Sequence, residues 1–201
     1  MATAETCSPM GRPREFDHDT VLQTVIDLFW EQGFRATSIG DIVARTGLSN
    51  SSLYAAFGAK HALFQTALDR YVADHERMIL DRLTNGERGL DDIEAFFVRD
   101  ELSDPDRPRG CLAVSTATEM RDVDPALVDL GVRHRDALRR GFTAALWRAA
   151  ELGEIDPDRV PHLADNLVTA VIGLTVMLSG GASTDELLTH LESTLASLRR
   201  P

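Results

Sequence analysis

Apolar residues recur every three or four positions along most of this chain, the spacing that places them on one face of an α-helix. No segment shows the strict alternation of apolar and polar residues that is typical of a half-buried β-strand, and the breaks in the pattern fall at Gly and Pro. The pattern predicts helices over residues 17–32, 39–46, 60–83, 93–102, 111–120, 125–152, 160–179 and 185–198, and a short helix after Ser49. We therefore expect an all-α fold.

The segment from Thr37 to Lys60 has the pattern of a helix-turn-helix that leads into a further helix. Gly47 suits the left-handed residue that ends a helix, and Ser49 suits the cap that starts the next one. The inner side would bury Ile42, Val43, Leu48, Leu53 and Phe57, which leaves Asn50, Ser51, Ser52, Ala55 and Ala56 facing outward. This outward face is small and polar, as expected of a helix that enters the major groove of DNA.

Further residues of the same kind and spacing extend this pattern on both sides: Phe29, Gly33, Phe34, Thr37, Ser38, Gly47, Leu48, Ser49, Leu53, Tyr54, Phe57, Lys60, Leu63 and Phe64. Together, residues 14–71 resemble the DNA-binding domain of TetR-family transcriptional regulators. The resemblance implies a three-helix DNA-binding domain over residues 14–59 and a helical effector-binding and dimerisation domain over residues 60–201. It also implies a dimeric repressor that a small molecule releases from a double-stranded DNA operator.

Phosphate contacts are expected from five side chains. The resemblance places Tyr54 and Lys60 against phosphates. Thr37 and Ser38, at the start of a helix, are placed to offer a hydroxyl or a helix N-terminus to a phosphate, although capping explains both residues as well. Arg45 is expected to reach a base or a phosphate, and its alternative is a plain surface charge.

Base contacts are expected at the start of the third helix, from Asn50, Ser51 and Ser52, in part through water, and Ser49 beside them is a further candidate for contact with DNA. Residues 1–13 are poor in apolar residues, and we expect a flexible arm in which Met10 is an alternative start. An arginine in such an arm can enter the minor groove, which makes Arg12 and Arg14 candidates. A tail without DNA contacts is the equal alternative.

The formal net charge of -11 argues, taken alone, against a nucleic-acid partner. Acidic and basic residues nearly balance over residues 11–60, however, so DNA binding must depend on a few placed groups and be sensitive to salt. Cys7 and Cys111 form no CxxC pair, which indicates a reducing cytoplasm, and we expect no metal or other cofactor. The longest uncharged apolar run, residues 167–178, is too short to span a bilayer.

The last two predicted helices carry the expected dimer interface. Residues 167–178 are apolar on nearly every face, so they need cover on more than one side. We expect Ala170 and Gly173 to allow close approach of a second copy. The interface would also include Leu174 and the leucine stripe of the last helix, Leu188, Leu191, Leu195 and Leu198. The alternative is a core seam inside a monomer.

An effector, a small apolar or amphipathic molecule, is expected in the second domain. His134 lies on an otherwise apolar helical stripe, where it is either a polar anchor for a ligand or, more commonly, a core histidine. The other candidate lining residues are Phe96, Phe97, Cys111, Met120, Phe142, Trp147 and Met177, and ordinary core packing is the alternative for each. A thiol or soft-metal sensor at Cys111, with Met120 or His134, is conceivable, but no metal-ligand spacing supports it.

Two other functions stay open. One is a helical small-molecule carrier or enzyme, but GxSxG, HExxH and phosphate-binding glycine loops are missing from the sequence, and we expect no enzyme. The other is a DNA-binding activator, or a repressor without ligand control, which a filled second domain would favour.

Overall fold

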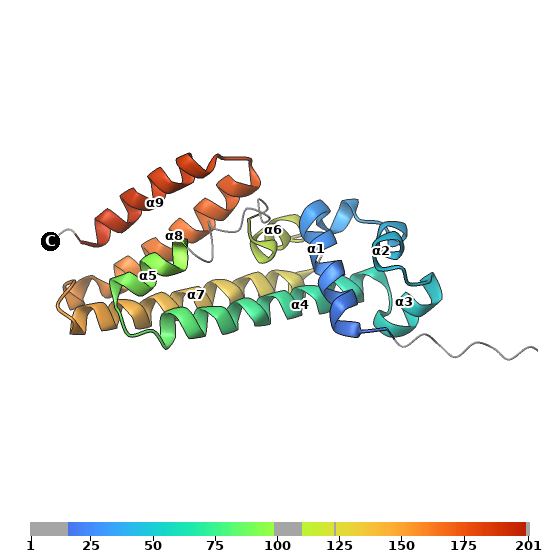
Figure 1. Ribbon diagram of the computed structural model, residues 1–201, viewed down its shortest axis with the longest axis horizontal. Helices are drawn as coiled ribbons and strands as arrows, with labels where there is room; N and C mark the ends of the chain where they lie inside the picture. Colours follow the sequence, from blue (N-terminus) through green and yellow to red (C-terminus); the bar gives the residue numbers. More distant parts are fainter. Residues whose placement is uncertain (1–15, 99–109, 123, 200–201) are drawn as a thin grey trace, which may run out of the picture.

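The structure is a computed structural model that describes residues 16–98, 110–122 and 124–199 of the chain. Every element in these ranges is helical, as the periodicity predicts (Figure 1). The α-helices are α1 (His18–Ala36), α2 (Ile39–Thr46), α3 (Asn50–Phe57), α4 (Lys60–Ile79), α5 (Leu90–Phe96), α6 (Leu112–Glu119), α7 (Pro125–Glu151), α8 (Val160–Ser179) and α9 (Thr184–Leu198). A π-helical segment, Leu80–Thr84, continues α4, and a 3-10 turn, Pro157–Arg159, precedes α8. The helix expected over residues 93–102 begins earlier, at Leu90, and its last residues lie outside the described ranges.

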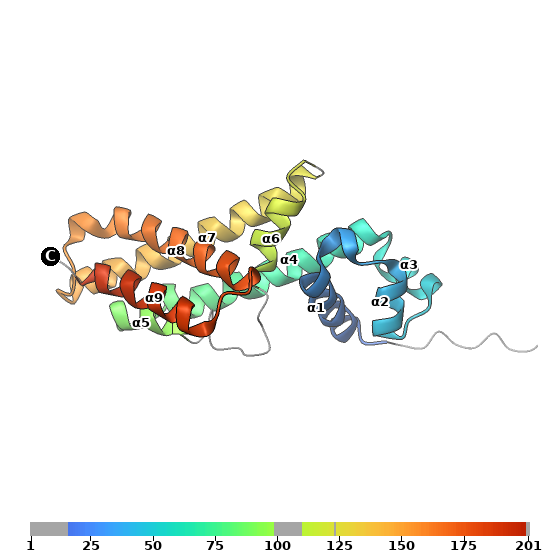
Figure 2. The same cartoon turned by 90° about the horizontal axis from the view of Figure 1, so that it is seen from above.

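Helices α1, α2 and α3 form a helix-turn-helix unit at one end of an elongated molecule, and α4 leads away from this unit (Figure 2). Asp17 caps α1 by accepting the Asp19 N–H at 3.1 Å. The interior of the unit is apolar, and Phe29, Ile42, Leu53 and Phe64 are each at most 1% exposed. Capping side chains therefore fix where these helices begin, and the shared apolar core fixes how the helices are oriented relative to one another.

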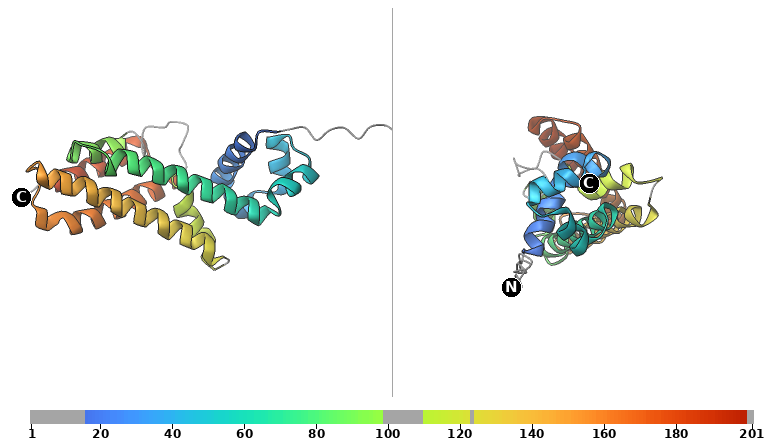
Figure 3. Two further views of the ribbon diagram at one scale, coloured as in Figure 1. Left: turned by 90° about the horizontal axis from the view of Figure 1, so that it is seen from below. Right: turned by 90° about the vertical axis from the view of Figure 1, so that its right-hand side faces the viewer.

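The other part of the molecule is built on the long helices α4 and α7, which run side by side (Figure 3). Helix α8 packs on α7, and α9 packs on α8. Gly141 explains the close crossing near the end of α4, because a Cβ at this position would lie 2.6 Å from a methyl carbon of Ile79. The core between these helices includes the rings of Phe96, Phe97 and Phe142, which contact one another.

Helix α6 joins the two parts. Its residues Leu112 and Ala113 are buried in the same apolar cluster as the helix-turn-helix core, together with Leu127 at the start of α7. Helix α6 and the start of α7 therefore pack with the helix-turn-helix unit and the first part of α4, while the second half of α7 packs with α8.

Residues Pro157–Ser179 are long and apolar enough to cross a membrane by length and composition, a longer stretch than the apolar run singled out in the sequence. Core helices of water-soluble proteins pass the same test, and here one side of α8 is packed on α7 and α9. Val176, on another side of α8, is 54% exposed. We assign the apolar character of the covered side of α8 to packing within the chain.

Candidate nucleic-acid interface and effector region

The turn between α2 and α3 has the geometry that the sequence predicts. Gly47 adopts φ 70° and donates its N–H to the Val43 carbonyl at 2.9 Å, which ends α2. Ser49 then caps α3 by accepting the Ser52 N–H at 3.1 Å. Leu53 is fully buried and anchors α3 to the core, so the opposite face of α3 points outward.

The outward face of α3 carries small polar residues and one aromatic ring. Asn50, Ser51 and Ala55 are exposed, and the Tyr54 side chain is 49% exposed. The Ser49 hydroxyl lies 2.9 Å from the hydroxyls of both Ser51 and Ser52, so the three serines form one local hydrogen-bonded group. This network holds the start of α3 in a defined shape, and Asn50 is exposed beside it with an amide that can both donate and accept hydrogen bonds.

Lys60 lies at the first position of α4, next to the helix-turn-helix unit. Its ammonium group is 4.3 Å from the centre of the Phe34 ring, and Phe34 itself packs on Phe64. A cation over an aromatic face is attracted to the ring, which limits the movement of this long side chain. The positive charge of Lys60 is thereby held at the edge of the α1–α3 unit.

Thr37 corrects one prediction, because its side chain is not at the surface. It is 1% exposed, and its hydroxyl donates to the Gly33 carbonyl at 2.7 Å. A hydroxyl buried and bonded in this way cannot contact a phosphate, so the part of the prediction that used the Thr37 hydroxyl is wrong. The sequence pattern does not distinguish a threonine that caps an exposed helix from one that joins two helices.

Ser38 is exposed, but its hydroxyl takes part in a capping box with Asp41 at the start of α2. It donates to the Asp41 carboxylate at 2.7 Å and accepts the Asp41 N–H at 3.1 Å. The hydrogen bonds that the carboxylate accepts from the Ser38 hydroxyl and then from the Ser38 backbone N–H lower the pKa of Asp41. The N-terminus of α2 therefore already holds a carboxylate, and any phosphate contact from Ser38 must be made beside that negative charge.

Arg45 is exposed and donates from Nη2 to the Glu31 carboxylate of α1 at 2.6 Å. This ion pair agrees with the surface-charge alternative, and a DNA contact would require Arg45 to exchange this partner. The candidates Arg12 and Arg14 lie outside the described residues.

A hollow of about 510 Å³ lies between α6, α7 and α8. Its apolar wall includes Val114 and Ala117 of α6, Leu138 of α7 and Ile172 of α8. Its polar lining residues are Thr118, Arg121, Asp122, His134 and Arg135. Ligand sites in proteins typically combine such a mainly apolar wall with a few polar groups, and this volume suits a small molecule.

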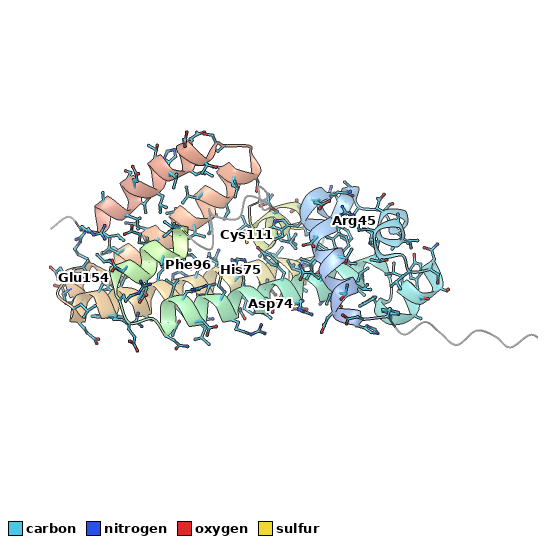
Figure 4. All side chains as sticks on the ribbon, in the orientation of Figure 1. Arg45, Asp74, His75, Phe96, Cys111 and Glu154 are labelled. Atoms are coloured by element: carbon cyan, nitrogen blue, oxygen red, sulfur yellow. The ribbon has the colours of Figure 1, made fainter. Side chains whose placement is uncertain are left out.

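His134 borders this hollow and is 3% exposed. Burial lowers the pKa of His134 from its usual 6.5 to about 4, so the imidazole is neutral at physiological pH. Its Nε2 lies 3.6 Å from the sulfur of Cys111, which also accepts the Tyr71 hydroxyl at 3.6 Å. His75 packs edge to face against His134, and Figure 4 shows Cys111 and His75 in the middle of the molecule.

The Nδ1 atom of His134 is buried and has no hydrogen-bond partner. A buried polar atom without a partner costs free energy, and a ligand or water molecule that reached it would recover part of that cost. His134 is thus buried, as the core-histidine alternative expects, but its Nδ1 atom has no hydrogen-bond partner.

Other predicted lining residues lie elsewhere. Phe96, Phe97 and Phe142 are fully buried and pack ring against ring, and Met120 is fully buried in the cluster beneath α1. Trp147 is 47% exposed on α7, and Met177 packs on the core of α7 and α8. Cys111 lies behind His134 rather than on the wall of the hollow. The sequence offered these residues mainly for their apolar or soft side chains, but such residues usually fill a core, and ordinary core packing is the alternative that fits the buried ones.

The structure also corrects the expected dimer seam. Leu174, Leu191, Leu195 and Leu198 are at most 9% exposed, because the leucine stripe of α9 packs on its own subunit. Gly173 and Leu188 remain exposed, and Ala170 is partly exposed. An apolar stripe has the same sequence pattern whether it packs on its own chain or on a second copy. Only the packing of the helices shows which of its residues remain at the surface.

Several residues of the effector region were not predicted. Arg121, Arg135 and Val132 line the hollow, and they carried no recognisable sequence signal. Gly131 and Ala117 did offer one, because small residues on facing helices allow close contact. A Cβ at Gly131 would lie 2.9 Å from the Cβ of Ala117, so α6 and α7 touch there. Among the described residues, no group of three or more His, Cys, Asp or Glu side chains is arranged to hold a metal ion.

Comparisons with known proteins find bacterial regulators with a similar sequence and fold. The profile described as bacterial regulatory proteins, tetR family, matches residues 21–67. The chain is 32% identical over 191 residues to the HTH-type transcriptional repressor ComR of Escherichia coli (strain K12), covering 92% of this chain and 90% of ComR. It is 30% identical over 193 residues to the HTH-type transcriptional regulator YezE of Bacillus subtilis (strain 168), covering 94% and 100% of the two chains.

Among solved structures, a cysteine mutant of the TetR family transcriptional regulator CifR in complex with 26 bp double-strand operator DNA superposes with a TM-score of 0.78. It is 30% identical in sequence and covers 94% of this chain and 100% of its own. A TetR transcriptional regulator from Chloroflexus aurantiacus also has a TM-score of 0.78, at 23% identity over 90% of this chain and 93% of its own, and shows the shared fold.

Proposed function

Because this chain belongs to the TetR family and is a DNA-binding transcriptional regulator rather than an enzyme, we propose that it is a homodimeric repressor whose operator affinity is lowered by a small-molecule effector. The observation that carries the DNA-binding part is the exposed polar face of α3, held in place by the buried Leu53. Such a face enters the major groove with its N-terminal residues against the base edges.

In this proposal, Asn50 and Ser51 contact bases, while Tyr54 and Lys60 contact phosphates on either side. Asn50 is the strongest candidate for sequence discrimination, because its amide can donate and accept at one base edge. Tyr54 is half-exposed beside it, and Lys60 is fixed near the same surface by Phe34. Phosphate contacts orient a protein on DNA but carry no sequence information. We therefore expect Asn50 and Ser51 to affect sequence selectivity, and Tyr54 and Lys60 to affect affinity for all sequences.

Dimerisation is proposed through the exposed side of α8 and α9. Val176 of α8 is 54% exposed and Leu188 of α9 is 37% exposed, and Gly173, three residues before Val176 on α8, is exposed as well. Large apolar side chains on adjacent helices that remain exposed favour contact with a second copy. A two-fold axis across this face would direct two α3 helices to two half-sites of a near-palindromic operator.

The effector is proposed to enter the hollow between α6, α7 and α8, where it meets His134. The hollow favours ligand control over a ligand-independent regulator, for which a filled domain was expected. Arg121 and Arg135 border the hollow with one acidic neighbour, Asp122, so an amphipathic molecule that carries an anionic group suits it best. A ligand changes DNA affinity only by binding one conformation of the protein more tightly than the other. As a DNA-binding regulator, the protein is proposed to act in the cytoplasm.

The test uses the wild-type protein to enrich duplexes from a random-sequence pool, followed by fluorescence anisotropy on the enriched and a scrambled duplex. We expect selective binding to a near-palindrome. Asn50→Ala should reduce the ratio between enriched and scrambled DNA, whereas Tyr54→Ala should weaken both. The control is Arg77→Gln, which removes an exposed charge from the far half of α4. Equal binding of both duplexes by the wild type would contradict the proposal.

A further inference from the structure

Glu119, the last residue of α6, makes an unusual contact with the helix-turn-helix unit. Its carboxylate accepts the Phe34 N–H on Oε2 at 3.1 Å and the Arg35 N–H on Oε1 at 2.8 Å. The Arg35 guanidinium also donates to the Glu119 backbone carbonyl at 3.5 Å. These residues are 84 and 85 positions apart in the chain, so the contact joins α6 directly to the end of α1.

The reason for the contact lies in the backbone of α1. Gly33 adopts φ 78° and ψ 168°, which interrupts the helix. The N–H groups that follow such an interruption lose their partners four residues earlier, as at any helix N-terminus. Glu119 supplies the missing acceptors, and its negative charge suits the positive end of the short turn that restarts at Phe34.

Gly33 is required here for two independent reasons. Its positive φ is strained for residues with a side chain. In addition, a Cβ at Gly33 would lie 3.0 Å from Glu119 Oε2, so the carboxylate can approach this closely because the side chain is missing.

The restarted turn leads directly into the DNA-binding surface. Thr37 donates its hydroxyl to the Gly33 carbonyl, and Ser38 caps α2 at the next position. Helix α2 in turn fixes α3 through the tight turn at Gly47. A shift of Glu119 would therefore move the start of α2, and α3 with it.

The opposite side of α6 faces the hollow. Val114 and Thr118 line it, and Ala117 rests against Gly131 of α7. Helix α6 is only eight residues long, so its two sides cannot move independently. It thus lies between the proposed effector site and the two N–H groups that Glu119 holds.

We propose that Glu119 is a positioning residue that sets the orientation of the helix-turn-helix unit and thereby the distance between the two α3 helices of the dimer. This inference rests on the proposed dimeric operator binding. Glu119 acts on DNA through the Gly33–Arg35 turn and does not touch DNA itself. Two further contacts cross the same joint, from the Trp30 indole N–H to the Gly110 carbonyl and between His61 and Asp124, so loss of Glu119 loosens the joint without separating it.

The test compares operator duplexes that differ in half-site spacing. Duplexes enriched by the wild type are prepared with the enriched spacing and with one and two extra base pairs between the half-sites. Binding is measured for the wild type, for Glu119→Gln and for the control Glu151→Gln, an exposed glutamate at the end of α7. Glutamine keeps the size of the side chain but offers one acceptor oxygen in place of two and directs an amide group at the second N–H.

We expect Glu119→Gln to bind the enriched spacing about tenfold more weakly, the loss that corresponds to one hydrogen bond to a charged group. The penalty for the longer spacings should shrink in this variant, because a loosened unit adapts to them. A residue that merely contacts DNA behaves differently: Lys60→Gln should weaken all spacings by the same factor. The Phe34 and Arg35 amides should also exchange hydrogen faster in Glu119→Gln, with core amides unchanged.

The inference would be overturned if Glu119→Gln discriminated between the spacings as strongly as the wild type does. It would also be overturned if the Phe34 and Arg35 amides exchanged hydrogen at the wild-type rate in this variant. If the wild type itself ignores spacing, the proposed dimeric operator binding fails instead. Glu119→Asp, which is one methylene too short to reach both N–H groups, provides a second variant if the glutamine substitution prevents folding, and the same outcomes apply to it.

Discussion

Gly173 offers the sharpest test of the proposed dimer, because a larger side chain at this position should leave the isolated subunit folded and weaken the dimer. A Cβ added at Gly173 meets no atom within 4 Å in the subunit, and the residue lies on the exposed side of α8. In an isolated subunit, Gly173→Ala should therefore stabilise the helix by about 1 kcal/mol, since glycine is the weaker helix former. For a chain of this size that corresponds to a rise of roughly 2–4 °C in Tm.

Gly173→Leu adds a larger side chain where the two α8 helices are proposed to meet. Overpacking of a close contact costs roughly 1–3 kcal/mol. The two-fold axis brings both copies of the substitution to the same interface, so the cost is about 2–6 kcal/mol per dimer. The dimer dissociation constant should then rise roughly thirtyfold or more. Because Gly173 is exposed and a Cβ there meets no atom of the subunit within 4 Å, we expect the monomer to fold normally.

Sedimentation equilibrium over a range of protein concentrations measures the dissociation constant directly. Circular dichroism at concentrations below it measures folding of the monomer. The control is Ala73→Leu, which also introduces a leucine at an exposed helical position, here on α4. A Gly173→Leu protein that remains a dimer with the wild-type dissociation constant would refute the assignment of this face, and the partner copy would have to be sought elsewhere on the surface.

Three further predictions follow from individual contacts. Lys60→Gln should reduce the slope of log Kobs against log salt by about 0.9 for each protomer, because one phosphate contact is lost per subunit; titrations at several salt concentrations measure it, and an unchanged slope would show that Lys60 does not touch DNA. Ser38→Ala should cost about 1 kcal/mol in urea unfolding by removing the capping box of α2, whereas Ser193→Ala on the exposed face of α9 should cost little. The pKa of His134 is lowered from 6.5 to about 4 in the folded protein, so the unfolded chain binds more protons between these values. Stability should therefore fall, by about 3 kcal/mol at most, as the pH drops through this window. Replacing His134 with Gln should flatten the pH dependence of the free energy of unfolding, and superimposable curves for the two proteins would contradict the assignment.

The helices and the helix-turn-helix were predictable because their signals are local. The turn at Gly47, the cap at Ser49 and the buried position of Leu53 all lie within a few residues of one another. Such features depend on backbone geometry and on helical periodicity, which any part of the chain carries by itself. The same holds for the exposed face of α3, since burial of one face of a helix leaves the other face outward.

The effector region was less predictable, because periodicity identifies an inward side chain but not what it meets inside. Phe96 and Phe142 were both candidates for a pocket wall, yet their rings fill the core against each other. Trp147 shares the helix of Phe142 and is nevertheless 47% exposed. Whether a large side chain lines a cavity depends on how several helices pack, and small differences in packing decide it.

The sequence by itself determined the all-α architecture, the helix-turn-helix and the family resemblance, because all three are properties of neighbouring residues. Only the tertiary structure decided that Thr37 is internal, that the leucines of α9 cover their own subunit, and that Glu119 holds the turn at Phe34. The last of these contacts joins residues 85 positions apart. No local pattern encodes such a pairing, since it exists only once α1, α4, α6 and α7 have packed together and brought a carboxylate to two N–H groups left without partners.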